Sequence, residues 1–133
     1  MRRSIHVVAA YIQRDGRVLL DRRRKGSHLA DTWEFPGGKR EAGESDHQAL
    51  IREIAEELGV AAEVSGPPVA RVEHAYPEFD LTLVLYPVKI VGEPRAVDVA
   101  EIEWFDPGQL DALPMPPADR PLVDAIRARA RHD

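Results

Sequence analysis

The apolar positions of this chain fall into short runs that predict β-strands separated by turns. Such runs cover residues 7–12, 18–20, 69–74, 81–91 and 102–105. Asp15-Gly16 separates the first two, and because glycine readily adopts positive φ, this pair predicts a tight β-hairpin. Residues 33–35 form another short candidate strand, which Pro36-Gly37-Gly38 ends. Pro87 inside the long run indicates a strand edge or a bulge, since proline has no backbone N–H to donate.

Two segments instead show the 3.6-residue periodicity of amphipathic helices. In residues 46–58 the apolar positions that share one helical face are Leu50, Ile51, Ile54, Ala55 and Leu58. Ser45 and Gln48 predict a capping box before this helix, and Gly59 has the position of a left-handed C-cap. Residues 121–131 predict a second helix with one apolar side, and residues 107–113 predict a short helical turn.

Mixed strands around two helices predict an α+β fold, in which helices cover a mixed central sheet as an α/β/α sandwich. With 133 residues, 44% apolar and 31% charged, we expect one globular domain spanning residues 1–133. The absence of cysteine excludes disulfides and thiolate metal sites and fits a reducing cytoplasm. No apolar run approaches the roughly 20 residues of a membrane span. We therefore expect a soluble, cytoplasmic protein without a membrane partner, either a monomer or a homodimer.

Charge is distributed unevenly along the chain. It contains 23 acidic and 18 basic residues, for a formal net charge of -5. Residues 1–25 carry eight bases and two acids, so this segment is +6 and the remainder is -11. Because polymeric nucleic acids are bound mainly by neutralising their phosphates, an acidic body argues against such a partner.

Several glutamates gather on one side of the first predicted helix. Glu53, Glu56 and Glu57 have the spacing i, i+3 and i+4, at which like charges repel. Glu44 precedes the helix beside a glycine-rich loop, and only Arg52 interrupts the acidic positions. One interpretation is an ordinary solvated acidic face. The alternative is a site for a hard cation such as Mg²⁺ or Mn²⁺, which prefers carboxylate oxygens.

The spacing of these residues resembles a known family motif. Gly38, five residues, Glu44, seven residues and then residues 52–60 (REIAEELGV) match the Nudix box at its nine specified positions over 23 residues. The chain is therefore identified as a member of the Nudix hydrolases. The resemblance implies an α/β/α sandwich that cleaves a nucleoside diphosphate linked to another group, with Mg²⁺ as cofactor and Mn²⁺ as a substitute.

Flanking segments extend the resemblance to the MutT-like branch, whose members act on nucleoside triphosphates. These segments are residues 33–39 (WEFPGGK), Arg22-Arg23, Tyr76-Pro77 and residues 116–119 (PPAD). Together with the box they spread the similarity over nearly the whole chain.

The family resemblance implies roles for the residues of the motif. The implied metal ligands are Gly38, Glu44, Glu53, Glu56 and Glu57, with Glu44 a further or indirect ligand. Glu53 is our choice for the base that takes a proton from the attacking water. Arg52 would orient the glutamates through charge-assisted hydrogen bonds. An additional carboxylate is expected shortly before Trp104, with Asp98 and Glu101 preferred over Glu103.

The same resemblance implies a set of substrate-binding residues, namely Arg23, His28, Trp33, Phe35 and Asp119. A guanidinium at Arg23 suits bidentate binding of phosphate. Asp119 has two interpretations that are compatible with each other, as a reader of the nucleobase and as the N-cap of the last helix. His74 and Tyr76 are further candidates for the base pocket.

These residues predict MutT-like hydrolysis of a (deoxy)nucleoside triphosphate to the monophosphate and pyrophosphate. The candidate substrates are 8-oxo-dGTP and CTP or a modified pyrimidine triphosphate. Asp119 stands where the oxidised-guanine enzyme has Asn, and Phe79 or Asp80 stands where it has Arg, which argues against 8-oxo-dGTP. An ionised Asp accepts hydrogen bonds from donors such as cytosine N4. The alternatives are hydrolysis of ADP-ribose, a dinucleoside polyphosphate or capped RNA, and a non-catalytic nucleotide-binding sensor.

Overall fold

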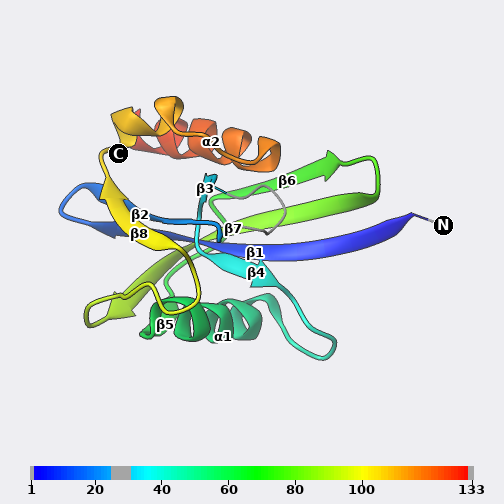
Figure 1. The fold of residues 1–133 in the computed structure, drawn as a ribbon, viewed down its shortest axis with the longest axis horizontal. Coiled ribbons are helices and arrows are strands. Elements are labelled where there is room, and N and C mark those ends of the chain that lie inside the picture. Colours follow the sequence, from blue (N-terminus) through cyan, green and yellow to red (C-terminus); the bar gives the residue numbers. More distant parts are fainter. Residues whose placement is uncertain (1, 25–30, 132–133) are drawn as a thin grey trace.

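The fold was analysed in a computed structural model that describes residues 2–24 and 31–131. The described part contains a mixed sheet of eight strands, two α-helices and two 3-10 helices (Figure 1). The strands are β1 (Arg3–Arg14), β2 (Arg17–Arg22), β3 (Trp33–Glu34), β4 (Gly37–Lys39), β5 (Ala61–Val64), β6 (Ala70–Ala75), β7 (Phe79–Val91) and β8 (Glu101–Phe105). The helices are α1 (Asp46–Leu58) and α2 (Arg120–Arg131), with the 3-10 helices η1 (Pro107–Ala112) and η2 (Pro117–Asp119).

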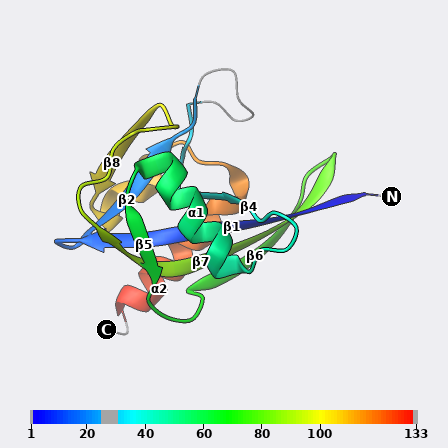
Figure 2. The ribbon, with the colours of Figure 1, turned by 90° about the horizontal axis from the view of Figure 1, so that it is seen from below.

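Two long strands form the centre of the sheet. β1 and β7 run parallel from the pair Arg3 and Phe79 to the pair Ile12 and Val88. β5 and β6 pair antiparallel with β7, β4 pairs with β1, and β3 and β8 both pair with β2. Helix α1 covers one face of this sheet and α2 covers the other (Figures 1 and 2). The predicted sandwich with a mixed central sheet is therefore confirmed.

Alternation along the central strands divides the core into two halves. On β1, Ala9 and Tyr11 face the α2 side, whereas Val8, Ala10 and Ile12 face the α1 side. The same parity holds on β7, whose odd positions Leu83 and Leu85 join the α2 half and whose even positions Val84, Tyr86 and Val88 join the α1 half. On β1 and β7, odd-numbered side chains therefore face α2 and even-numbered side chains face α1.

Helix α1 has the predicted limits and caps. Ser45 and Gln48 form the capping box, and Gly59 ends the helix with φ 69° in the left-handed region. Its buried residues are Ala49, Leu50, Ile54 and Leu58. Ile51 is 41% exposed and Ala55 is exposed, so the predicted apolar face was wrong by a small rotation about the helix axis. The apolar pattern alone does not fix this rotation, because the face that is buried depends on where the sheet contacts the helix.

Several other elements differ from the sequence-based expectation. β1 begins at Arg3 rather than residue 7, and α2 begins at Arg120 rather than residue 121. β4 and β5 were not predicted, since both are short and neither alternates clearly. Pro87 lies between the part of β7 that pairs with β6 and the part that pairs with β5, so its missing N–H interrupts neither ladder. No helix among the described residues is long and apolar enough to span a membrane.

Candidate active site

A cavity of about 530 Å³ opens on the α2 side of the sheet. Odd-numbered residues of the two central strands form its floor, which includes Ile5 and Val7 from β1 and Leu81 and Leu83 from β7. These positions lie next to one another because β1 and β7 run parallel and in register. The floor is therefore a smooth apolar surface, which suits a flat ring better than a charged group.

The glycine-rich turn and α1 form the acidic end of the cavity. Gly37 and Gly38 lie in β4, opposite Ala9 and Val8 of β1. Gly37 N–H donates to Glu57 Oε2 at 3.1 Å. A β-carbon at Gly37 would collide with the Val8 carbonyl oxygen, and one at Gly38 would collide with the carboxyl group of Glu53. Gly37 requires glycine, since the β1 backbone approaches too closely for a side chain, whereas a side chain at Gly38 would displace the carboxyl group of Glu53.

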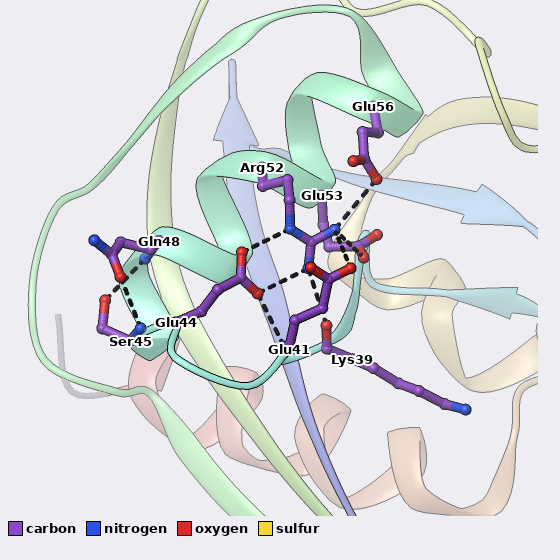
Figure 3. Close-up of polar contacts among 8 residues, drawn as sticks. All are labelled: Lys39, Glu41, Glu44, Ser45, Gln48, Arg52, Glu53 and Glu56. Atoms are coloured by element: carbon purple, nitrogen blue, oxygen red, sulfur yellow. Dashed lines mark hydrogen bonds and ion pairs between the residues drawn. The ribbon is translucent and has the colours of Figure 1, made fainter.

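Arg52 donates hydrogen bonds to three glutamates and forms a longer ion pair, at 3.8 Å, with a fourth, Glu41 (Figure 3). Its Nε and Nη2 donate to the two oxygens of Glu44 at 2.7 and 3.0 Å. Its Nη1 donates to Glu53 Oε1 at 2.9 Å and to Glu56 Oε2 at 3.3 Å. A further bond from Nη2 reaches the Lys39 carbonyl at 3.1 Å, which joins α1 to β4. We call Arg52, Glu44, Glu53 and Glu56 the Arg52 cluster.

The acids near Arg52 differ in their proton affinity. Hydrogen bonds from Arg52 lower the pKa of Glu44 to about 2. Burial raises the pKa of Glu53, although the bond from Arg52 opposes this shift. Burial also raises the pKa of Glu57, and the charges of Asp21, Glu53 and Glu34 add to the effect. A cation bound beside Glu57 would reverse this shift, because the ion would favour the charged carboxylate.

Arg52 holds three of the expected metal ligands close together. Within residues 2–24 and 31–131, no three Asp, Glu or His side chains are arranged to hold a metal. Glu53 and Glu56 both accept hydrogen bonds from the guanidinium of Arg52. Glu53 and Glu57 line the cavity together with Gly38. Hard carboxylate oxygens beside an open cavity fit Mg²⁺ or Mn²⁺, which keep positions for water and phosphate.

The three candidates for an additional carboxylate ligand occupy different places. Asp98 lines the cavity, and its backbone N–H lies 3.3 Å from the carbonyl oxygen of Glu57. Its side chain accepts a hydrogen bond from Arg24 at 2.7 Å. Glu101 forms an ion pair with Arg22 at 2.9 Å, and neither Glu101 nor the exposed Glu103 is among the residues that line the cavity. The geometry therefore favours Asp98.

The predicted substrate-binding residues also separate into distinct groups. Arg23, Phe35 and Asp119 line the cavity. Trp33 does not line it, since its ring packs in the core against Phe105 with centroids 5.0 Å apart. His28 lies outside the described residues, so its predicted role stays untested.

Asp119 lies at the start of α2, where an N-cap was predicted, but its side chain points elsewhere. It is 6% exposed, and its Oδ2 accepts a hydrogen bond from the Phe35 backbone N–H at 3.3 Å. Burial, followed by the nearby charge of Glu34, raises the pKa of Asp119 to about 8. A buried carboxyl that titrates near neutrality can either donate or accept a hydrogen bond.

Asp119 belongs to a set of three neighbouring carboxyl groups that are largely shielded from water. Glu34 is bound by Arg23, whose Nη1 lies 3.1 and 2.9 Å from the two carboxylate oxygens. Asp21, the cross-strand neighbour of Glu34, is only 1% exposed. Within the described part of the chain, neither oxygen of Asp21 has a hydrogen-bond partner. We call Asp21, Glu34 and Asp119 the inner acids. Burial, then the charges of Glu34 and Asp119, raise the pKa of Asp21 far above its usual range.

Tyr76, which was named as a further candidate for the base pocket, lines the cavity and forms a hydrogen bond with the Ala118 backbone. Other residues of this site were missed by sequence reasoning. The ring of Phe79 lies 5.0 Å from that of Tyr76 and also lines the cavity. Lys39, which pairs with Val7, and Arg3 line the cavity as well. Odd-numbered residues of β1 and β7 face the cavity, and this alternation could have identified Arg3 and Phe79 from the sequence.

Comparisons with known proteins agree with this geometry. The model of the NUDIX domain family matches residues 7–125. The CTP pyrophosphohydrolase of Escherichia coli is 38% identical, with 95% of this chain and 93% of that protein aligned. An 8-oxo-dGTP diphosphatase of Haemophilus influenzae is 36% identical over 94% of this chain and 93% of its own. A crystal structure of a MutT NUDIX hydrolase from Burkholderia pseudomallei superposes with a TM-score of 0.84 at 31% identity, covering 94% of this chain and 99% of that one.

Proposed function

The chain belongs to the NUDIX family and is a hydrolase of phosphorus-containing anhydrides, and we propose that it sanitises the nucleotide pool by hydrolysing nucleoside triphosphates. The products would be a nucleoside monophosphate and pyrophosphate. Because such nucleotides are cytoplasmic metabolites, we place the enzyme in the cytoplasm. CTP and related amino-bearing pyrimidine triphosphates are our preferred substrates, which agrees with the name of the Escherichia coli relative.

One observation carries this proposal, namely the continuous path from an apolar floor to a carboxylate end within one cavity. Phe35, Leu81 and Tyr76 offer apolar and aromatic surface to a base. Arg23 and Lys39 also line the cavity and supply positive charge for phosphates. Glu53 and Glu57 lie beyond them at the glycine turn. A nucleotide fits this order with its base over the floor and its phosphates at the acidic end.

We assign the metal site to Glu53, Glu56 and Glu57, with Gly38, Glu44 and Asp98 as additional or indirect ligands. Mg²⁺ bound there would neutralise phosphate charge and acidify a bound water molecule. Arg52 would then keep its two bonds to Glu44 while it releases Glu53 and Glu56. Glu44 would thus hold Arg52 in place. This role agrees with the two hydrogen bonds from Arg52 to Glu44, which lower the pKa of Glu44 to about 2.

Glu53 is the residue to which we assign proton removal from the attacking water. Its side chain is 16% exposed and lines the cavity, so it can reach a reacting phosphate without full solvation. Burial raises its pKa, which makes the carboxylate a better proton acceptor near neutral pH. The proton would move to a carboxylate oxygen of Glu53 as the water oxygen bonds to phosphorus and the bond from that phosphorus to the departing pyrophosphate breaks.

Asp119 is our candidate for reading the base. Its position in the cavity wall lets an ionised carboxylate accept a hydrogen bond from the amino group of cytosine. Guanine also offers amino and ring N–H donors, so a guanine nucleotide is the main competing substrate. Uracil offers no amino group, and we expect it to bind more weakly.

A panel of canonical and oxidised nucleoside triphosphates, ADP-ribose and a dinucleoside tetraphosphate tests this proposal. We expect the largest kcat/KM with an amino-bearing pyrimidine triphosphate, and formation of pyrophosphate together with the monophosphate. Release of neither product from any triphosphate would exclude the proposed reaction. Preferred turnover of ADP-ribose or the dinucleotide would reassign the substrate while keeping the same machinery.

The variant Glu53→Gln tests the assignment of the base. We expect kcat to fall by about 10²–10⁴-fold, the range that a positioned general base typically contributes. Glu63→Gln is the matched control, because Glu63 is an exposed glutamate on β5 that does not line the cavity. Circular dichroism and thermal unfolding should show that both variants are folded. A near-normal kcat for Glu53→Gln would show that another group removes the proton.

A further inference from the structure

The apolar floor of the cavity ends on a positively charged side chain. Arg3 is the first residue of β1 and lines the cavity in the same row as Ile5 and Val7. Its partner across the parallel pair is Phe79, the first residue of β7, which lines the cavity as well. Six residues separate Arg3 from Ala9, which pairs with Gly37, so the two ends of the floor are about 20 Å apart along β1.

The neighbouring residue fixes the direction in which Arg3 points. Arg2 donates hydrogen bonds to Asp80 Oδ1 at 2.9 and 3.1 Å, and to the carbonyl oxygens of Tyr76, Pro77 and Phe79. These bonds attach the start of β1 to the β6–β7 turn, and the two segments extend together at one end of the molecule (Figures 1 and 2). Because side chains alternate along a strand, anchoring Arg2 outside the cavity turns Arg3 toward it.

The guanidinium of Arg3 is exposed and has unused hydrogen-bonding capacity. Within the described residues its side chain forms no ion pair or hydrogen bond, unlike those of Arg2, Arg14 and Arg52. Asp119 lies elsewhere in the wall of the same cavity. A guanidinium only donates hydrogen bonds, and an ionised carboxylate only accepts them. The cavity therefore offers a donor and an acceptor to one ligand bound over its floor.

We propose that Arg3 is a specificity-determining residue, which binds an acceptor atom on the outer edge of the nucleobase. This inference rests on the proposed function. We assign the acceptor that Arg3 binds to a carbonyl oxygen, so a base that satisfies both Arg3 and Asp119 needs a carbonyl as well as an amino donor. Cytosine and guanine carry both a carbonyl and an amino group, whereas adenine lacks the carbonyl and uracil lacks the amino group. Arg3 would thus narrow the substrate class from nucleoside triphosphates in general to those of aminated, carbonyl-bearing bases.

Steady-state kinetics of Arg3→Ala with CTP as the probe test this inference. We expect KM to rise about tenfold, the size of one hydrogen bond from a charged donor, while kcat stays within twofold of the unmodified protein. Arg3→Lys keeps the positive charge but loses the planar guanidinium group. We expect its KM for CTP to lie between those of the unmodified protein and Arg3→Ala. Arg17→Ala is the matched control, since Arg17 is an exposed arginine at the start of β2, outside this cavity.

Ribose 5-triphosphate, which has no base, shows which part of the nucleotide Arg3 contacts. If Arg3 binds the base, the inhibition constant of this compound should be equal for the unmodified protein and Arg3→Ala. If Arg3→Ala raises the KM for CTP and the inhibition constant of ribose 5-triphosphate by the same factor, Arg3 binds phosphate or sugar. If the KM for CTP changes by less than twofold, Arg3 has no role in binding. Both outcomes overturn the inference. If the unmodified protein hydrolyses no triphosphate, the proposed function fails instead, and calorimetric binding of CTP to both proteins still decides the role of Arg3.

Discussion

The Arg52 cluster and the inner acids contain the same chemical groups in opposite electrostatic situations. In the Arg52 cluster, one guanidinium binds three carboxylates near the surface of α1, and the pKa of Glu44 is held at about 2. Among the inner acids, Arg23 binds only Glu34, while Asp21 and Asp119 are almost fully buried. Burial is the first cause of their raised pKa values.

The difference shows that burial and pairing, rather than residue type, decide what a carboxyl group can do. Hydrogen bonds from Arg52 hold the pKa of Glu44 low, whereas burial raises the pKa of Asp21 and of Asp119, because a charge away from water is unfavourable. The same cavity has Glu53 of the Arg52 cluster at one end and Asp119 in its wall.

Of the changes that distinguish the Arg52 cluster from the inner acids, removing the cation from the Arg52 cluster should have the largest effect. In Arg52→Gln the carboxylates of Glu44, Glu53 and Glu56 lose their common partner and repel one another. We expect kcat to fall by about 10–100-fold, as is typical when a residue that orients metal ligands is lost. The measurement is kcat at saturating Mg²⁺, compared with Arg71→Gln, which alters an exposed ion pair with Glu73 on β6. Equal kcat in both variants would mean that Arg52 does not position the glutamates.

Removing an unpaired carboxyl from the inner acids should instead stabilise the protein. Asp21→Val replaces a buried group without a hydrogen-bond partner by an apolar side chain suited to a strand. We expect the free energy of unfolding at pH 8 to rise by about 1–3 kcal/mol, the usual penalty of a buried unsatisfied polar group.

The gain from Asp21→Val should depend on pH with a defined sign. Because the folded pKa of Asp21 is raised, the folded protein binds more protons than the unfolded chain above pH 3.8, and its stability falls as pH rises. The variant loses this dependence, so its gain should be larger at pH 8 than at pH 5. Chemical denaturation at the two pH values, with Asp124→Asn on the exposed side of α2 as control, measures the difference. Destabilisation of Asp21→Val at both pH values would contradict the prediction.

The smallest effect concerns the titration of Asp119 and the choice of base. With a pKa of about 8, Asp119 becomes a pure acceptor as the pH rises above that value. We expect the preference for CTP over UTP, expressed as the ratio of kcat/KM values, to increase about fivefold between pH 6.5 and 9. The ratio cancels the ionisation of the phosphates, which both substrates share. Asp119→Asn should remove this pH dependence. If the CTP-to-UTP ratio in that variant rises with pH as it does in the unmodified protein, the titrating group is not Asp119.

Much of the fold could be predicted from local patterns. The capping box and Gly59 set the limits of α1, and the structure confirms them. Alternation and the Asp15-Gly16 turn predicted the first hairpin, although only the parallel pairing with β7 extends β1 back to Arg3. The buried side of α1 was predicted with a rotational error, because Ile51 and Ala55 are as apolar as their buried neighbours.

The sequence by itself determined the family and the acidic motif, because these depend on spacing along a single helix and its flanking turn, and the family resemblance implied the α/β/α architecture. Only the tertiary structure showed that Asp98 faces the cavity while Glu101 pairs with Arg22, and that Trp33 belongs to the core. The same holds for the grouping of the inner acids and for the position of Arg3 in the cavity, because these residues come from strands and turns far apart in the chain. Spacing encodes contacts within an element, whereas burial and the pairing of distant charges exist only after the sheet has assembled.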